Sequence, residues 1–151
     1  MTETSIIVTC SQCNTKNRIP ENRIKDNPVC GKCKTPLPKI PVFKRPVVVT
    51  DATFDDEVLS HPGPVLLDFW ASWCAPCGAM APVMERLAGR YSGRVKITKL
   101  NVDQNPITAA KYNVLSLPTL LFINSGKVVG TAAGALPEKE IEDKMKYYLR
   151  V

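Results

Sequence analysis

The stretch Asp68-Phe69-Trp70-Ala71-Ser72-Trp73-Cys74-Ala75-Pro76-Cys77 joins an apolar strand pattern to a helical pattern. The run 64–71 is almost continuously apolar, as expected of a central strand that is buried on both faces. A helical pattern follows from Cys74 to about Tyr91. At a helix N-terminus, unpaired backbone N–H groups and the helix dipole favour a thiolate. We therefore predict that Cys74 is an exposed attacking nucleophile, and that Cys77, one turn further on, is a buried resolving thiol.

Strands and helices alternate on both sides of this junction. The expected elements are a strand over 46–50, a helix over 51–60 capped by Thr50 or Asp51, a strand over 64–71, a helix over 74–91, a strand over 95–102, a helix over 105–112 capped by Asn105-Pro106, a strand over 119–123, a turn over 124–127, a strand over 127–131 and a helix over 137–150. This βαβαβαββα order predicts an α/β fold with a sheet covered on both faces. A C-x-x-C pair in such a setting indicates thiol–disulfide chemistry.

The ten-residue stretch resembles the active-site segment of the thioredoxin family. Leu117-Pro118-Thr119 resembles the family's cis-proline loop, and Gly134-Ala135-Leu136 resembles its substrate-facing glycine segment. The resemblance covers roughly residues 47–151. It implies the thioredoxin fold, a mixed central sheet with helices on both faces, and the activity of a protein-disulfide reductase.

The resemblance also implies roles for individual residues. Asp68 matches a buried carboxylate that moves a proton to or from the resolving thiol, and burial should raise its pKa. The alternative is a buried Asp68 with a structural role only. Lys99 matches a lysine near that carboxylate, and Pro118 matches the cis-proline that faces the disulfide. The apolar rim that would receive substrates consists of Trp73, Ala75, Pro76, Leu117, Gly134 and Ala135.

The implied partners are disulfide-containing protein substrates and an NADPH-dependent thioredoxin reductase, with no organic cofactor bound. Two positions depart from the family pattern: Ala75 stands where glycine is usual, and Gly78 stands where a basic residue is frequent. Both positions adjoin the cysteines, so they bear on the redox potential rather than on the reaction. His61, the single histidine, lies in a predicted loop and is expected to have no catalytic or metal-binding role.

The four remaining cysteines form two further C-x-x-C pairs, Cys10/Cys13 and Cys30/Cys33. The 16 residues between the pairs give a spacing that is typical of a structural zinc site, in which four thiolates hold one ion tetrahedrally. The surrounding segment of about 35 residues has few apolar residues, so it needs such a staple to fold. Asn14 and Gly31 are expected to adopt positive φ around the metal. The alternative is that these cysteines form redox-active disulfides.

A zinc module in front of a thioredoxin domain resembles the zinc-containing thioredoxin-2 type of bacterial thioredoxins. Asn17-Arg18-Ile19-Pro20, followed by the second cysteine pair, fits that pattern. We therefore divide the chain into a Cys₄ module over 1–38, a proline-rich linker over 39–46 and a thioredoxin domain over 47–151. Because zinc-bound thiolates can be oxidised, the zinc site is either structural only or also responsive to oxidants.

Composition and charge narrow the setting. The chain has 44% hydrophobic residues, but no apolar run approaches the roughly 20 residues that span a bilayer, and the N-terminus lacks the features of a signal peptide. We therefore expect a cytoplasmic protein without membrane contact, and a monomer. In the cytoplasm thiols are kept reduced, so paired cysteines there bind metals or do chemistry. An oxidase or isomerase is disfavoured, because such enzymes work in oxidising compartments.

The net charge of +6 belongs entirely to the first 50 residues. A module that delivers the redox domain to a nucleic acid or an acidic protein is therefore the alternative function. No aromatic residue interleaves these basic residues before Phe43, which argues against base stacking with nucleic acid.

Overall fold

The computed structural model describes residues 5–38 and 42–151. Residues 1–4 of the predicted module and 39–41 of the predicted linker lie outside this range. Among the described residues, no helix is both long enough and apolar enough to cross a membrane.

A mixed sheet forms the centre of the larger part of the chain. Within the described residues its strands are β3 (Val47–Val48), β4 (Pro64–Trp70), β5 (Lys96–Asn101), β6 (Thr119–Asn124) and β7 (Lys127–Ala133), in the order β3-β5-β4-β6-β7. The central strand β4 pairs in parallel with β5 and antiparallel with β6. The end of β4 that leads into the C-x-x-C pair therefore lies in the middle of the sheet.

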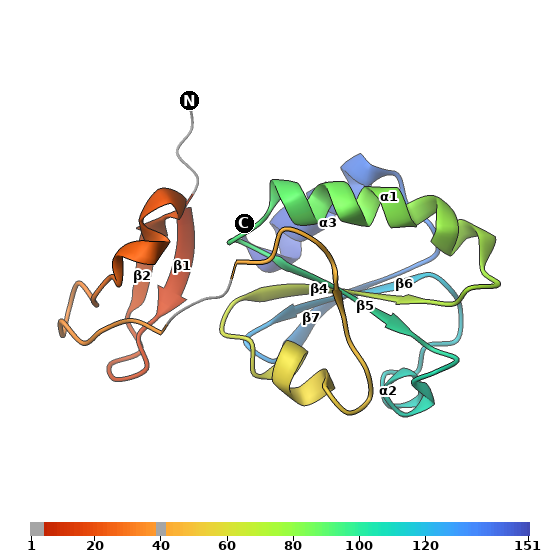
Figure 1. The fold of residues 1–151 in the computed structure, drawn as a ribbon, viewed down its shortest axis with the longest axis horizontal. Coiled ribbons are helices and arrows are strands. Elements are labelled where there is room, and N and C mark those ends of the chain that lie inside the picture. Colours follow the sequence, from red (N-terminus) through yellow and green to blue (C-terminus); the bar gives the residue numbers. More distant parts are fainter. Residues whose placement is uncertain (1–4, 39–41) are drawn as a thin grey trace.

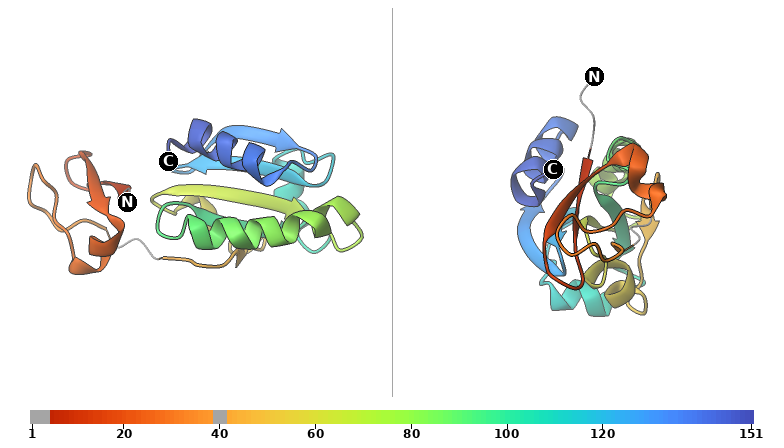
Figure 2. Two further views of the ribbon diagram at one scale, coloured as in Figure 1. Left: turned by 90° about the horizontal axis from the view of Figure 1, so that it is seen from above. Right: turned by 90° about the vertical axis from the view of Figure 1, so that its left-hand side faces the viewer.

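Helices cover both faces of this sheet (Figure 1). Helices α1 (Ala75–Arg90) and α3 (Glu138–Leu149) lie side by side on one face, as Figure 2 shows from above. Helix α2 (Pro106–Lys111) and the short π-helical turn η2 (Asp55–Leu59) cover the other face. The predicted α/β fold and the order of its elements are confirmed.

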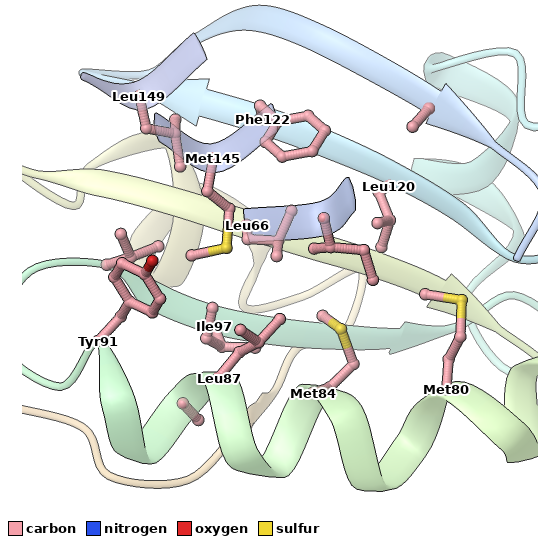
Figure 3. Packing of buried hydrophobic residues seen from close by; sticks show 14 residues of the cluster. Leu66, Met80, Met84, Leu87, Tyr91, Ile97, Leu120, Phe122, Met145 and Leu149 are labelled. Carbon is pink, nitrogen blue, oxygen red and sulfur yellow. The ribbon is translucent and has the colours of Figure 1, made fainter. Parts of the chain in front are cut away.

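The continuous apolar run of β4 serves two cores. On one face, Leu66 packs with residues of α1 and α3; Figure 3 shows Met80, Met84 and Leu87 of α1, and Tyr91 at its C-terminal end, pointing toward the sheet. On the other face, Leu67 and Phe69 pack against η2 and the loops around α2. Because successive side chains of a strand point to opposite faces, a strand buried on both sides shows no alternation in its sequence.

The helix predicted over 51–60 differs from the structure. A turn precedes η2, and Thr50 caps it: its Oγ1 accepts a hydrogen bond from the Thr53 amide at 3.2 Å, while Thr53 Oγ1 accepts one from the Thr50 amide at 2.9 Å. Of the two predicted cap residues, Thr50 closes the turn before η2, and η2 itself has no side-chain cap.

Asp51 instead caps α2, which lies more than 50 residues further along the chain. Its carboxylate accepts hydrogen bonds from the Ile107 amide at 3.2 Å, the Thr108 amide at 2.8 Å and the Thr108 hydroxyl at 2.6 Å. Partial burial acts to raise the pKa of Asp51, but the Thr108 and Ile107 hydrogen bonds outweigh it and lower the pKa. The predicted cap, Asn105, points away and accepts a hydrogen bond from the Asp51 amide at 2.9 Å.

The N-terminal part contains an antiparallel hairpin of β1 (Ser5–Thr9) and β2 (Lys16–Pro20), followed by the 3₁₀ helix η1 (Glu21–Asp26). This hairpin was not predicted from the sequence. Its small core lies on one face of the hairpin and includes cysteines; the buried members are Ile6, Val8, Cys10, Ile19, Cys30 and Leu37.

Candidate active site and metal centre

The junction between β4 and α1 positions the first reactive sulfur. Cys74 is the N-cap of α1, with φ −87° and ψ 105°, and its Sγ accepts a hydrogen bond from the Cys77 amide at 3.2 Å. Pro76 lies in the first turn, where the missing amide proton removes no helical hydrogen bond. Cys74 and Cys77 are joined by a disulfide, with their Cα atoms 5.3 Å apart. The sequence prediction that these two residues pair at a helix N-terminus is therefore confirmed.

Both cysteines are buried. The exposed fractions are 6% for Cys74 and 3% for Cys77, so the expectation of an exposed Cys74 is wrong. The physical reason is that Trp70 and Leu117 pack against the cysteines together with Ala71. Leu117 comes from a loop 43 residues along the chain, which a local pattern does not reveal.

Asp68 lies on β4 and is 5% exposed. Its Oδ1 has no hydrogen-bond partner among the described residues. Burial raises the pKa of Asp68 to about 7, and the positive charge of Lys99 opposes that rise. Lys99 lies opposite Asp68 in the parallel register of β4 and β5.

A cavity of about 230 Å³ connects these groups. Its lining includes Asp68, Cys74, Cys77 and Lys99. This volume can hold several water molecules, and the charged lining offers them hydrogen-bond partners. The arrangement can therefore move a proton between the carboxylate and a thiol without direct contact.

The predicted cis-proline loop lies beside the disulfide. The Leu117–Pro118 peptide bond is cis, and the Pro118 carbonyl accepts a hydrogen bond from the Gly134 amide at 2.8 Å. Gly134 has φ +90°, a conformation that favours glycine. The two segments that the sequence analysis assigned to the rim are thus tied together.

The other predicted rim residues are exposed. Trp73 is 69% exposed, and Ala75, Pro76 and Ala135 are also exposed. Asp103 was not predicted from the sequence, and its Oδ2 accepts a hydrogen bond from the Trp73 indole at 2.8 Å. Asn101 Oδ1 in turn accepts a hydrogen bond from the Asp103 amide at 3.0 Å, which fixes the turn that carries the carboxylate.

His61 lies in a separate buried cluster. It is 8% exposed and packs against the Phe43 ring, at a centroid distance of 6.5 Å. Burial and the neighbouring Lys96 lower the pKa of His61 to about 4. Lys96 is also buried, and it was not predicted from the sequence. It donates hydrogen bonds to Glu57 Oε2 at 2.6 Å and to the Glu57 carbonyl at 2.7 Å. This cluster joins η2 to β5 and has the character of a structural ion pair.

The sulfurs of the four N-terminal cysteines lie together, all within 4.8 Å of one another. Cys10 Sγ and Cys33 Sγ are 3.6 Å apart, as are Cys13 Sγ and Cys30 Sγ. Four thiolates at about 2.3 Å from one tetrahedral Zn²⁺ would be about 3.8 Å apart, so the cluster has the dimensions of a zinc site. All four cysteines are free, which argues against the alternative of disulfides.

The two C-x-x-C knuckles repeat one hydrogen-bond pattern. The carbonyl of Cys10 accepts from the Asn14 amide and that of Cys30 from the Lys34 amide, each at 3.0 Å. The residues with positive φ are Asn14, at 60°, and Lys34, at 64°. The prediction for Asn14 is therefore confirmed, whereas Lys34 takes the place that we predicted for Gly31.

Hydrogen bonds prepare one sulfur of the cluster for metal binding. Donors from the backbone of Cys33 and Lys32 and from the Asn17 side chain outweigh burial and lower the pKa of Cys30 to about 6. The Asn17 Nδ2 to Cys30 Sγ distance is 3.6 Å. Because Zn²⁺ binds the deprotonated sulfur, donor groups aimed at the ligand fit the metal.

Comparison with known proteins agrees with both parts of the chain. The family profile described as "Thioredoxin" matches residues 45–147, and the profile described as "Thioredoxin 2, N-terminal" matches residues 9–35. "Thioredoxin" of Haemophilus influenzae is 46% identical over 101 residues, which are 67% of this chain and 94% of that protein. "Thioredoxin 2" of Chlorobaculum tepidum is 48% identical over 100 residues, which are 66% of this chain and 92% of that protein.

The chain therefore belongs to the thioredoxin family, with an N-terminal zinc ribbon of the thioredoxin-2 type. It is a thiol–disulfide oxidoreductase, and its C-x-x-C pair, Cys74 and Cys77, is the active site of a disulfide reductase.

Proposed function

We propose that this protein is a cytoplasmic protein-disulfide reductase, recycled by an NADPH-dependent thioredoxin reductase. The observation that carries the proposal is the shared cavity that joins the active-site disulfide to Asp68, a buried carboxylate whose Oδ1 has no hydrogen-bond partner among the described residues. The protein works as a monomer without membrane or nucleic-acid contact, and its substrates are disulfide-containing proteins.

The reaction begins with the thiolate of Cys74 in the reduced protein. Cys74 Sγ attacks one sulfur of the substrate disulfide, a mixed disulfide forms, and the other substrate sulfur leaves as a thiolate. Cys77 Sγ then attacks Cys74 Sγ and releases the second substrate sulfur. Two electrons pass to the substrate, and the Cys74–Cys77 disulfide forms. The position of Cys74 at the start of α1 supports its role, because the helix N-terminus favours the thiolate.

Asp68 accepts the proton that Cys77 loses before its attack. A carboxyl group with a pKa of about 7 exchanges protons readily near neutral pH. Lys99 limits the rise of that pKa and keeps part of the population ionised. Water in the cavity carries the proton between the two groups.

The rim holds the substrate chain. Pro118 and Leu117 form one side of the docking surface, where the backbone of Leu117 pairs with an extended substrate. Gly134 and Ala135 continue that side. Trp73, Ala75 and Pro76 form the opposite side. The hydrogen bond between the Gly134 amide and the Pro118 carbonyl supports this grouping.

The N-terminal module holds one Zn²⁺ through Cys10, Cys13, Cys30 and Cys33. Bound zinc would supply a tetrahedral cross-link between the two knuckles and leave no open position for chemistry. We propose that the module comprises residues 1–38, the linker 39–46 and the redox domain 47–151. Peroxide treatment tests whether the zinc site also responds to oxidants. Metal release and thiol oxidation are measured together, and zinc that is retained after the Cys74/Cys77 pair is fully oxidised would count against such a response.

Insulin reduction tests the proposed function. Wild-type protein with NADPH and a thioredoxin reductase should reduce insulin, and Cys74→Ser should abolish turnover. Cys77→Ser should accumulate mixed disulfides with its substrates, because the attack that releases them is lost. Turnover that survives in Cys74→Ser would contradict the nucleophile assignment. A metal content far from one zinc per chain would contradict the zinc proposal.

A further inference from the structure

Two large apolar side chains near the active site are almost fully in solvent. Trp73 is 69% exposed, and Leu115 is 95% exposed, the highest value among the large apolar residues in the described part of the chain. Single exposed apolar side chains are common on protein surfaces. The position of Leu115 relative to the reactive sulfur is what gives it meaning.

Leu115 lies in the loop that leads to the cis-proline. Leu117, two residues further on, packs against the buried cluster of Ala71, Cys74 and Cys77. Two residues of extended chain span at most about 7 Å, so the backbone of Leu115 lies within that distance of the backbone of Leu117. A substrate segment that reaches Cys74 therefore passes within a few residues of Leu115.

The loop that carries Leu115 is held at both ends. At its start, the Asn113 amide donates to the Ala110 carbonyl at 3.1 Å and the Val114 amide to the Ala109 carbonyl at 3.0 Å. At its end, Thr119 Oγ1 donates to the Ser116 carbonyl at 2.6 Å. A side chain presented on a fixed loop contacts a partner without the cost of ordering the loop.

The surroundings of Leu115 favour an apolar partner. Residues 113–118, Asn-Val-Leu-Ser-Leu-Pro, contain no charged side chain. Cys74 is only 6% exposed, so a substrate sulfur must approach closely, and the residues beside it must press against this loop. Contact with Leu115 then removes apolar surface of both partners from water.

We propose that Leu115 is a specificity-determining residue, which selects disulfide substrates that carry a large apolar side chain within about three residues of the attacked cysteine. This inference rests on the proposed function and names the substrate class of the same site. Leu115 contacts the substrate beside the reacting sulfur and takes no part in the electron transfer.

Two matched peptide disulfides provide the test. Each is a symmetrical dimer of a short peptide with one cysteine, and the two differ only in a leucine or a serine placed two residues from that cysteine. Reduced full-length protein converts each dimer to two thiols while Cys74 and Cys77 form their disulfide. Hydroxyethyl disulfide, which has no side chains, reports the chemistry alone.

Wild-type protein should reduce the leucine dimer about tenfold faster than the serine dimer, measured as the second-order rate constant for the reduced protein. Leu115→Ser should bring this ratio close to one without changing the rate on hydroxyethyl disulfide, and Leu115→Met should keep the wild-type ratio. Val48→Ser, which removes a 66%-exposed apolar side chain from the edge strand β3, should leave the ratio unchanged.

The outcomes separate the two proposals. Equal rates on both dimers with the wild-type protein, or a ratio that Leu115→Ser leaves unchanged, would overturn the role of Leu115 and leave the reductase function intact. Failure to reduce hydroxyethyl disulfide and both dimers would overturn the reductase function and the inference that rests on it.

Discussion

Asp68 on β4 and Lys99 on β5 occupy opposite positions in the parallel register, and both line the cavity that also reaches Cys74 and Cys77. Burial and the lysine act in opposite directions on the carboxyl group, and burial has the larger effect, since the pKa of Asp68 rises to about 7. This balance sets the pH range in which the buried carboxyl group changes its charge.

Asp68→Asn should stabilise the oxidised protein at alkaline pH. An aspartate in the unfolded chain titrates near 3.8, whereas the pKa of folded Asp68 is about 7. Between these values the folded protein holds a proton that the unfolded chain has lost, so stability falls as the pH rises. The variant should gain at most about 4 kcal/mol at pH 9 and little at pH 4, measured by urea denaturation. Asp143→Asn, on the exposed surface, is the control; an equal gain at both pH values would exclude this explanation.

Lys99→Met should raise the pKa of Asp68 further. The lysine charge stabilises the ionised carboxylate, so its removal should shift the pKa upward. Titration of the Asp68 carboxyl carbon by NMR measures the effect directly. Lys146→Met on the exposed surface of α3 should leave it unchanged. An unchanged or lowered pKa in Lys99→Met would contradict the proposed pairing.

Gly130→Ala and Gly78→Ala should change stability in opposite directions. A Cβ at Gly130 on β7 would meet the ring of Tyr148 at 2.5 Å, so the ring must move, at a cost of about 1–3 kcal/mol. A Cβ at Gly78 on α1 meets nothing within 4 Å, and alanine in a helix gains about 0.5–1 kcal/mol over glycine. Thermal denaturation of both variants measures the difference. If Gly130→Ala left the stability unchanged, the ring of Tyr148 would be free to move, and the predicted cost would be wrong.

Asp51→Ala should destabilise the redox domain by about 1–2 kcal/mol, because it removes the cap of α2. Asp51→Asn keeps an oxygen acceptor and should lose less. Denaturant titration should show both effects, and hydrogen exchange at Ile107 and Thr108 should quicken in Asp51→Ala. Unchanged exchange at these amides would contradict the capping role.

Removal of zinc should unfold the N-terminal module and spare the redox domain. The buried core of the module is small, and metal binding in comparable structural sites contributes on the order of 10 kcal/mol. After chelation of the full-length protein, amide resonances of β1 and β2 should collapse while those of 47–151 persist. Cys30→Ser should act like chelation, whereas Ser11→Ala should not. A hairpin that survives metal loss would disprove the stapling role.

Local patterns predicted most elements of the redox domain. Strand β4 and helix α1 could be predicted from their own residues alone, because a strand buried on both faces and a helix each give a recognisable pattern in consecutive residues. The cis bond before Pro118 was expected from the family resemblance alone, and the structure contains it.

The errors concern partners that lie far apart in sequence. The cap of α2 comes from Asp51, which is 57 residues from Thr108, so the local candidate Asn105 looked sufficient. Burial of Cys74 depends on Leu117, and the pairing of buried Lys96 with Glu57 spans 39 residues. In the N-terminal module, only a few apolar residues mark the hairpin, because the cysteine cluster replaces much of the core that a hairpin of this size would otherwise need.

The separation of the sulfurs into two groups has a consequence for biosynthesis. Six cysteines can pair into three disulfides in about 15 ways. In a protein whose activity is thiol–disulfide exchange, any of these pairings can form. The four clustered thiols are also close enough to one another to be joined by an oxidant. A metal held there while the chain is still being made would act as a protecting group, and it would leave Cys74 and Cys77 as the pair that remains free to react.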